Sequence, residues 1–397
     1  MRHVCLAVAL AAAALIAGLL GAWPAAAGPA QPQSPQSPQS PQWAQVSAGG
    51  EDTCAVQTNR TLWCWGSDRH GVLGDYRTDG NVPAPQRVGL RAGWVQVAVG
   101  MNHACAVRND HSLWCWGSGA DGELGIGTTA QHDHPMQVAG GDGYAFVTGA
   151  GGYDCAIRVD GTLWCWGSNS NGNLGNGDEV DQLSPVQVGT ATDWTLVSAG
   201  PAIACGAQAD GSGWCWGNGI NGQLGNGQYG AGTHSDVPLQ LPGGDVWASV
   251  SPGGGATCGI EDSGTLWCWG SNFWGEMGNG TTQAFPDQTT PIQVGVRTGW
   301  VQVGSGNQYV CALHGEPTLW CWGNGVSGEL GTGRASGDQT VPARVGSSPN
   351  WVQVSVGFAS TCGIQRGHTL WCWGDNSYGE AGTGSFASPL TTPQQVF

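Results

Sequence analysis

The sequence predicts an all-β protein, a seven-bladed β-propeller built from seven repeats of about 51 residues. The motif Trp-Cys-Trp-Gly occurs seven times at intervals of 50 to 53 residues. The composition, with 70 Gly, 21 Pro and only 10% charged residues, suits short strands and tight turns better than helices. A repeat of this length is one small unit that becomes stable when neighbouring copies pack against it.

The residues that precede the repeats have a different character. Residues 1–27 combine a basic start, a long apolar run and small residues before Gly28, which predicts a secretory signal peptide cleaved near Ala27. An uncleaved membrane anchor is the alternative. Residues 28–42 repeat Ser-Pro-Gln and predict an extended Pro/Gln/Ser-rich linker, and residues 43–397 are left for the propeller. We therefore expect a secreted or otherwise extracytoplasmic protein.

The charge of the chain bears on its partners. It has 28 acidic and 12 basic residues, a net charge of −16, and all 12 basic residues are Arg. Removal of the signal peptide would make the net charge about −17, because Arg2 would be lost. Phosphate backbones and anionic lipid heads are normally held by Lys and Arg. We therefore expect no nucleic-acid partner, and no membrane insertion after cleavage.

The cysteines follow the same repeat. Fourteen of the 15 form seven pairs ten residues apart, and only Cys5, in the predicted signal peptide, is left over. In an exported chain this pattern predicts disulfides. Zinc is the alternative, but its sites use short Cys-x-x-Cys knuckles, which do not occur here. The predicted bonds are Cys54–Cys64, Cys105–Cys115, Cys155–Cys165, Cys205–Cys215, Cys258–Cys268, Cys311–Cys321 and Cys362–Cys372.

The third repeat shows why this spacing fits a hairpin. A three-residue turn with Gly161 in a left-handed conformation would place Cys155 opposite Cys165 and Ala156 opposite Trp164. Cysteines facing each other in a non-hydrogen-bonded pair lie within disulfide distance. Each bond is therefore predicted to join neighbouring strands of one hairpin. The repeated Trp residues face small residues across the hairpin, which predicts that they pack in the core.

Two further strand patterns frame each hairpin. A Trp/Tyr-x-x-Val strand precedes it, and a Pro-x-x-Val strand follows it after a long Gly-rich loop, which gives four strands per repeat. Only a short link joins Pro-x-x-Val to the next Trp-x-x-Val, and short links usually join neighbouring strands. We therefore expect each blade to begin with Pro-x-x-Val. The strand at Thr392–Val396 would then pair with the strand that begins at Trp43 and close the ring.

The repeat reads Gly-x-x-His/Thr-x-Cys-Ala, then a turn, then Leu-Trp-Cys-Trp-Gly-x-Asn-x-x-Gly-x-Leu-Gly-x-Gly. It resembles the repeat of the regulator of chromosome condensation family, in its secreted, cysteine-bearing bacterial form. The resemblance covers all seven repeats and implies a seven-bladed propeller. It implies less about activity, because propellers acquire function through their loops. The family's namesake is a nuclear guanine-nucleotide exchange factor. Such activity is disfavoured here by the signal peptide and the acidic charge, whereas a secreted inhibitor in the family is a precedent for protein binding.

The sequence lacks recognisable signatures of catalysis. Neither a Gly-x-Ser-x-Gly motif nor a phosphate-binding loop with its Lys is present, and the His residues do not recur at a repeat position. His132-Asp133-His134 is the one tract with metal-ligand character, and its more ordinary role is an exposed turn. We therefore expect no enzyme activity, no cofactor and no metal site.

Departures from the repeat point to a binding surface. Just before the first Gly of the long loop, most repeats have a polar residue, but repeats five and seven have Trp274 and Tyr378. Phe273 precedes Trp274, and repeat one has His70. Aromatic residues that the fold does not need commonly anchor interfaces. We therefore predict that these four residues contact a partner. The expected function is a monomeric, possibly inhibitor-like extracellular protein-binding scaffold, with a lectin-like binder of cell-wall or matrix glycans as the alternative.

Overall fold

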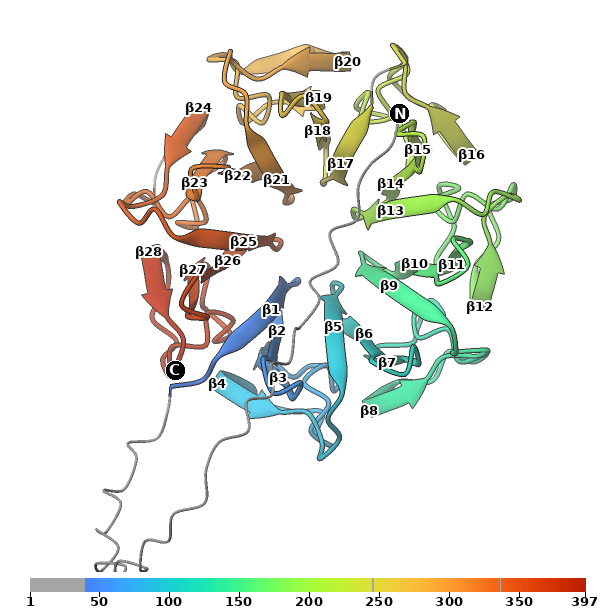
Figure 1. Cartoon of the computed structure of the whole chain (residues 1–397), viewed down its shortest axis with the longest axis vertical. Helices are drawn as coiled ribbons and strands as arrows, with labels where there is room; N and C mark the ends of the chain where they lie inside the picture. The colour runs from blue at the N-terminus through green and yellow to red at the C-terminus, as the bar shows by residue number, and fades with distance from the viewer. Residues whose placement is uncertain (1–39, 245, 336) are drawn as a thin grey trace, which may run out of the picture. The chain divides into compact units, whose positions relative to one another are not determined.

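The computed structural model describes residues 40–244, 246–335 and 337–397, with the backbone alone for residues 283–287. These residues form 28 strands in seven four-stranded antiparallel sheets, and no helix occurs among them. The sheets are arranged as blades around a central axis, so the described part of the chain is a seven-bladed β-propeller (Figure 1). The predicted signal peptide and nearly all of the predicted linker lie outside the described residues.

Each repeat supplies one strand of each kind. The inner strands are β1 (Trp43–Ala48), β5 (Trp94–Val99), β9 (Tyr144–Gly149), β13 (Trp194–Ala199), β17 (Trp247–Pro252), β21 (Trp300–Ser305) and β25 (Trp351–Val356). The second strands are β2 (Asp52–Gln57), β6 (His103–Arg108), β10 (Tyr153–Arg158), β14 (Ile203–Gln208), β18 (Ala256–Glu261), β22 (Tyr309–His314) and β26 (Ser360–Gln365). The third strands are β3 (Leu62–Ser67), β7 (Leu113–Gly117), β11 (Leu163–Gly167), β15 (Gly213–Asn218), β19 (Leu266–Asn272), β23 (Thr318–Gly323) and β27 (Leu370–Gly374). The outer strands are β4 (Asn81–Arg87), β8 (His132–Gln137), β12 (Gln182–Gln187), β16 (His234–Gln240), β20 (Gln283–Gln293), β24 (Gln339–Arg344) and β28 (Leu390–Gln395).

The second and third strands pair in the register that the sequence predicts. In blade 3, Cys155 lies opposite Cys165 and Ala156 lies opposite Trp164. All seven predicted cysteine pairs are joined, each with a Cα–Cα distance of 4.1 Å. Gly161, in the turn, has a φ of 79°, a left-handed conformation that glycine adopts without steric cost. Each blade is therefore crosslinked internally, between adjacent strands.

The predicted closure of the ring by a shared strand is wrong. β28 pairs with β27 of its own repeat, with Trp371 opposite Gln395, so each blade consists of four consecutive strands. The expectation failed because we took the short link before each inner strand for a hairpin within one sheet. In the structure this link crosses from the outer edge of one blade to the centre of the next, and the long loop folds the outer strand back along the third strand (Figure 1).

Blades 7 and 1 are instead joined by hydrogen bonds from both side chains and backbone. The backbone amide of Val46 donates to Gln353 Oε1 at 3.2 Å, and the indole nitrogen of Trp65 donates to the Glu380 carbonyl at 2.9 Å. The backbone amide of Trp43 donates to the His368 carbonyl at 2.9 Å. The first and last repeats therefore meet in the same way as any other neighbours.

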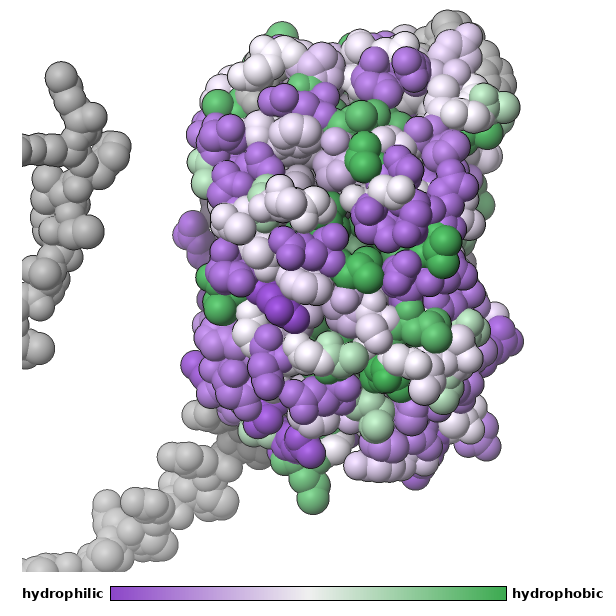
Figure 2. Space-filling view, turned by 90° about the vertical axis from the view of Figure 1, so that its right-hand side faces the viewer, coloured by the Kyte–Doolittle hydropathy of each residue, from purple (hydrophilic) through white to green (hydrophobic). Residues whose placement is uncertain are grey.

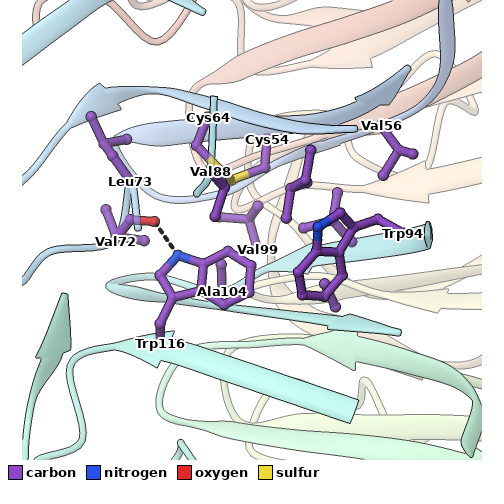
Figure 3. Packing of buried hydrophobic residues seen from close by; sticks show 13 residues of the cluster. Cys54, Val56, Cys64, Val72, Leu73, Val88, Trp94, Val99, Ala104 and Trp116 are labelled. Atoms are coloured by element: carbon purple, nitrogen blue, oxygen red, sulfur yellow. Dashed lines mark hydrogen bonds between the residues drawn. A yellow bond between two sulfur atoms is a disulfide. The ribbon is translucent and has the colours of Figure 1, made fainter. Parts of the chain in front are cut away.

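The hydrophobic core lies between blades. Figure 3 shows the cluster of blades 1 and 2, in which the Cys54–Cys64 disulfide packs toward Trp94 and Trp116. Six similar clusters lie between the remaining neighbours. The second Trp of each Trp-Cys-Trp motif is fully buried and donates its indole hydrogen to a carbonyl in the long loop of the preceding blade, as Trp116 does to Val72 at 2.7 Å. These contacts make each blade depend on its neighbour.

Close packing also explains one glycine of the long loop. The indole of Trp116 lies against Gly74, where an added Cβ would stand 2.8 Å from the indole nitrogen. The φ of Gly74 is 66°, which disfavours other residues. Gly382 lies against the indole of Trp65 in the same way. The Leu-Gly step of the loop therefore has a packing role that recurs around the ring.

Candidate functional site

The long loops share one face of the propeller with the turns between the inner and second strands. The two kinds of loop touch, since the Ser67 amide, at the end of β3, donates to the Glu51 carbonyl of the turn at 2.9 Å. On this face a central cavity of about 110 Å³ is lined by the turns of all seven blades. Met101 and Phe358 stand at its rim, 40% and 47% exposed. This surface, which we call the loop face, carries the residues predicted to bind a partner.

The long loops are held rigidly by their own polar side chains. In blade 5, Asn272 Oδ1 accepts the amide hydrogen of Met277 at 3.0 Å, and Glu276 Oε2 accepts that of Trp274 at 2.8 Å. Asn376 and Glu380 repeat both bonds in blade 7, at 2.9 and 2.8 Å. Such local bonds satisfy the loop backbone without secondary structure. In blades 5 and 7 the two residues at the tip of the loop are therefore presented from a fixed base.

The predicted binding residues fall into two groups on the loop face. Phe273 is 54% exposed, and its ring lies edge-on to the half-buried Trp274 with centroids 5.0 Å apart. Tyr378 of blade 7 is half-buried under the guanidinium of Arg69, 5.5 Å from its ring centre, and His70 next to Arg69 is exposed. Blade 6 lies between these groups (Figure 1). The fold thus brings the residues of blades 7 and 1 together but places Phe273 and Trp274 one blade away.

Two further apolar residues were missed by the sequence analysis. Ile220 and Val326 hold the loop position of Phe273 in blades 4 and 6, and they are 47% and 58% exposed. Comparing the repeats one position earlier in the loop would have revealed them. Together with Phe273 and Trp274 they form a run of apolar residues over three consecutive blades, which we call the apolar arc. By contrast, Figure 2 shows the outer edge of the propeller with apolar residues scattered among polar ones.

A buried ion pair between blades 2 and 3 was not predicted. His103 Nε2 lies 2.8 Å from Asp154 Oδ2, and both side chains are almost completely buried. Burial lowers the pKa of His103, but the charge and hydrogen bond of Asp154 outweigh this and raise it above its usual value. Burial also raises the pKa of Asp154, which the His103 charge partly offsets. The pair bridges two blades below the surface, where a substrate could not reach it.

The metal-binding potential of this pair is limited. Among the described residues, His103, Asp154 and Cys105 form the one group of three His, Cys or carboxylate ligand atoms close enough to share an ion. The sulfur of Cys105 is already bonded to Cys115. The tract His132-Asp133-His134 is not an exposed turn as expected, because it forms the partly buried start of strand β8. His134 stacks on Tyr76 with ring centroids 4.9 Å apart. Throughout the part of the chain that the structure describes, no helix is long and apolar enough to cross a bilayer.

Comparisons with known proteins agree on the repeat. The Regulator of chromosome condensation (RCC1) repeat matches residues 61–107, 110–157, 160–207, 263–313 and 318–364, and a second pattern for the same repeat matches residues 94–123 and 351–380. The mitochondrial RCC1 domain-containing protein RUG3 of Arabidopsis thaliana is 32% identical over 152 residues, 38% of this chain and 34% of RUG3. The human E3 ubiquitin-protein ligase HERC2 is 29% identical over 153 residues, 37% of this chain and 3% of HERC2. The matched region is thus about a third of RUG3 and a small part of HERC2.

Solved structures show the same architecture. Human WBSCR16 superposes with a TM-score of 0.73 at 20% identity, covering 82% of this chain and 88% of that structure. Yeast RCC1 (Prp20), solved with Kap60, gives a TM-score of 0.74 at 18% identity, with 84% and 83% covered. At such identities the likeness establishes the fold alone. The repeat matches cover more than half of the chain, and they show that it belongs to the family of proteins built from Regulator of chromosome condensation (RCC1) repeats.

Proposed function

We propose that this protein is an extracytoplasmic scaffold that binds another protein through its loop face, and that it acts by binding and not by catalysis. The observation that carries the proposal is the apolar arc. Ile220, Phe273 and Val326 are each about half exposed on adjacent blades, with Trp274 beside them. Their exposed apolar area does not contribute to the core, and area of this kind is typical of interaction sites.

The geometry of the loops supports this function. Because the loop bases are fixed by hydrogen bonds, the tip residues lose little freedom on binding, which favours affinity. A half-buried Trp next to an exposed Phe resembles the aromatic anchors that dominate binding energy at interfaces. Tyr378 and His70, on blades 7 and 1, would contact the edge of a partner that spans several blades. The central cavity would allow a side chain of that partner to enter between Met101 and Phe358.

The disulfides support a location outside the cytoplasm. Seven bonds in one chain are typical of proteins that fold in an oxidising compartment. The acidic, Lys-free composition favours a partner with a basic rim. Among proteins of the same fold, Prp20p of Saccharomyces cerevisiae has been studied for its binding to Gsp1p and histones. That example supports a protein as the ligand class here, and it does not identify the ligand.

The test is capture of partners by matched variants. Oxidised, immobilised protein would be exposed to the secreted proteins of its source organism, and retained proteins would be quantified. The test variant is Phe273→Ser with Trp274→Ser on the loop face. The control is Leu90→Ser with Val296→Ser, which alters two residues, 90% and 94% exposed, in the links at the opposite face. We expect a true partner to bind the test variant roughly tenfold or more weakly, and the control unchanged.

The result also separates protein from glycan as the ligand. Exposed aromatic side chains stack on sugar rings as well as on protein, so the same variants would be applied to arrays of cell-wall and matrix glycans. Saturable glycan binding that depends on Phe273 and Trp274, without any protein partner, would replace the proposal by a lectin-like function. Equal binding of the test and control variants would place the binding site elsewhere.

A further inference from the structure

The arginines of this protein are concentrated on one face of the propeller. Arg2 lies outside the described residues, and eight of the other 11 Arg lie opposite the loop face, on what we call the link face because it carries the links between blades. They occupy these links, the turns between the second and third strands, or the adjoining strand ends: Arg60, Arg87, Arg91, Arg108, Arg158, Arg297, Arg344 and Arg366. All but Arg158 belong to blades 6, 7, 1 and 2, which are consecutive in the ring (Figure 1). We call this part of the link face the basic half.

Few acids balance these arginines. If each link is counted with the blade that it enters, the described residues of the basic half include two acids, Asp110 and Glu316. Asp110 pairs with Arg108 at 3.2 Å, and the other six Arg of the basic half have no carboxylate within ion-pair distance among the described residues. Blades 3 to 5 have the opposite balance on this face, with Arg158 against Asp142, Asp160, Asp193, Asp210, Glu261 and Asp262. The net charge of −16 therefore does not describe the basic half.

Backbone hydrogen bonds connect the turns and links of the basic half across blades. The Trp43 amide of blade 1 donates to the His368 carbonyl at 2.9 Å, in the turn of blade 7 that carries Arg366. The Arg60 carbonyl, in the turn of blade 1, accepts from the Gly93 amide at 3.0 Å, in the link to blade 2. The unpaired arginines thus extend from a connected surface and not from separate flexible loops.

Aliphatic side chains stand out among these arginines. Leu90 and Val296, in the links into blades 2 and 6, are 90% and 94% exposed. Each is followed by an arginine whose guanidinium lies over an indole of the third strand, 4.5 Å from the ring centre for Arg91 and 4.4 Å for Arg297. These contacts hold the positive charge at the protein surface while the aliphatic side chain extends beyond it. Proteins that bind to the surface of an anionic bilayer combine apolar and cationic groups in this way.

We propose that the basic half rests on an anionic lipid surface, with Leu90 and Val296 entering the interface and the unpaired arginines contacting phosphate head groups. No part of the propeller crosses the bilayer in this arrangement. An acidic protein would offer the same charge, but protein interfaces depend on anchors packed into pockets, whereas single aliphatic side chains that are almost wholly exposed suit lipid better. The chain also enters the propeller here, since the Gln42 carbonyl accepts from the Thr58 amide at 2.9 Å in the turn of Arg60. The predicted signal peptide, which directs a chain to a membrane, is therefore joined to this face.

The acidic remainder of the protein is compatible with this contact. A strand of six residues spans about 20 Å, so the acids of the loop face lie more than two Debye lengths from the lipid at physiological salt, where that length is about 8 Å. Repulsion of blades 3 to 5 would tilt the ring so that blades 6, 7, 1 and 2 make the contact. The loop face would remain open to the medium. The proposal is independent of the partner that the loop face binds.

The test is sedimentation of the intact oxidised protein with lipid vesicles. Vesicles of phosphatidylcholine mixed with phosphatidylglycerol should bind it and phosphatidylcholine alone should not, and raising NaCl from about 0.1 to about 1 M should release it, because the Debye length falls from about 10 to about 3 Å. Arg60→Gln with Arg366→Gln should weaken binding about tenfold or more, since both guanidinium groups lack other partners among the described residues. Leu90→Ser with Val296→Ser should weaken it several-fold. The matched control is Arg77→Gln with Arg334→Gln, the same charge change in exposed residues of the long loops, which should bind as the wild type does.

Several results would overturn the proposal. Equal binding to neutral and anionic vesicles, or equal losses in the two arginine pairs, would show that the basic half is not the contact. Binding of soluble polyglutamate without vesicle binding would indicate an acidic protein partner instead. Salt-sensitive self-association without vesicle binding would indicate that the acidic loop face of a second copy covers the basic half. All the substituted residues are exposed, so each variant should keep the wild-type unfolding midpoint, and if one pair does not fold the other still decides the question.

Discussion

Trp114 and Trp116, two residues apart in one strand, should contribute very differently to stability. The perturbation is replacement of each by Phe. Trp116 is fully buried between blades 1 and 2, and its indole nitrogen donates to the Val72 carbonyl at 2.7 Å (Figure 3). Trp114 is half-buried. Its indole nitrogen donates a hydrogen bond to Ser112 Oγ at 2.9 Å, and the Arg91 guanidinium lies 4.5 Å from the centre of its ring.

The structure sets the two magnitudes. Trp116→Phe leaves a buried carbonyl without its donor, which costs about 1–3 kcal/mol. The smaller ring also leaves a cavity of roughly 40 Å³, which at about 24 cal/mol per Å³ adds about 1 kcal/mol. The expected loss of unfolding free energy is therefore about 2–4 kcal/mol. Trp114→Phe should cost about 1 kcal/mol or less, because the Ser112 hydroxyl keeps its own hydrogen bond to Asp110 and Phe can still lie under Arg91.

Denaturant unfolding followed by fluorescence would measure the difference. A lower midpoint with an unchanged slope reports a loss of stability, whereas a changed slope would indicate loss of cooperativity between blades. Equal destabilisation by the two substitutions would refute the reasoning, because it would mean that the bond between blades adds nothing beyond ring burial.

Three further predictions follow from other parts of the structure. Peptide mapping without reduction should find each of the 14 paired cysteines linked to the one ten positions away, and links between repeats would contradict this. Replacing both Cys155 and Cys165 by Ser should cost roughly 3 kcal/mol, because the bond closes a loop of about 11 residues. Deleting residues 390–397 should increase hydrogen exchange in β27, its observed partner, while β1 stays protected, and the reverse pattern would restore the shared-strand closure. Burial raises the pKa values of Glu329 and Glu380 to about 7, whereas an unfolded Glu releases its proton near pH 4.3. The folded state therefore binds more protons between these values, and thermal stability should fall as pH rises from about 5 to 8. Glu329→Gln should flatten the dependence of the thermal unfolding midpoint on pH, whereas Glu316→Gln, at an exposed position, should leave it unchanged. A wild-type midpoint that rises between about pH 5 and 8 would refute the raised pKa values of the two buried Glu residues.

The parts of the fold that recur in every repeat could be predicted from the sequence. Hairpin register follows from the turn length, the cysteine spacing and the alternation of side chains, and these agree in all seven copies. The closure could not be deduced in the same way, because a short link fits both a hairpin and a crossing between blades. What distinguishes them is the packing of the third strand against the long loop of its neighbour, as in the contact of Trp65 with Glu380.

The site was predictable only where a residue departs from one repeat position. Trp274 and Tyr378 stand out in this way, but Ile220 and Val326 become significant only when three blades are seen side by side. The His103–Asp154 pair occurs once, and its two members belong to different repeats. No pattern within a single repeat could reveal that these side chains meet across the gap between blades.

The position of the disulfides has a consequence for proteolysis. Each bond spans the tight turn between the second and third strands, and in blade 3 that turn includes the 60% exposed Val159. A protease that cuts there would separate the polypeptide into two fragments that remain covalently attached across the cut. Nicked molecules would keep their mass without reductant and divide into fragments only when it is added. In a protease-rich medium, damage at any of these seven turns would leave the loop face assembled.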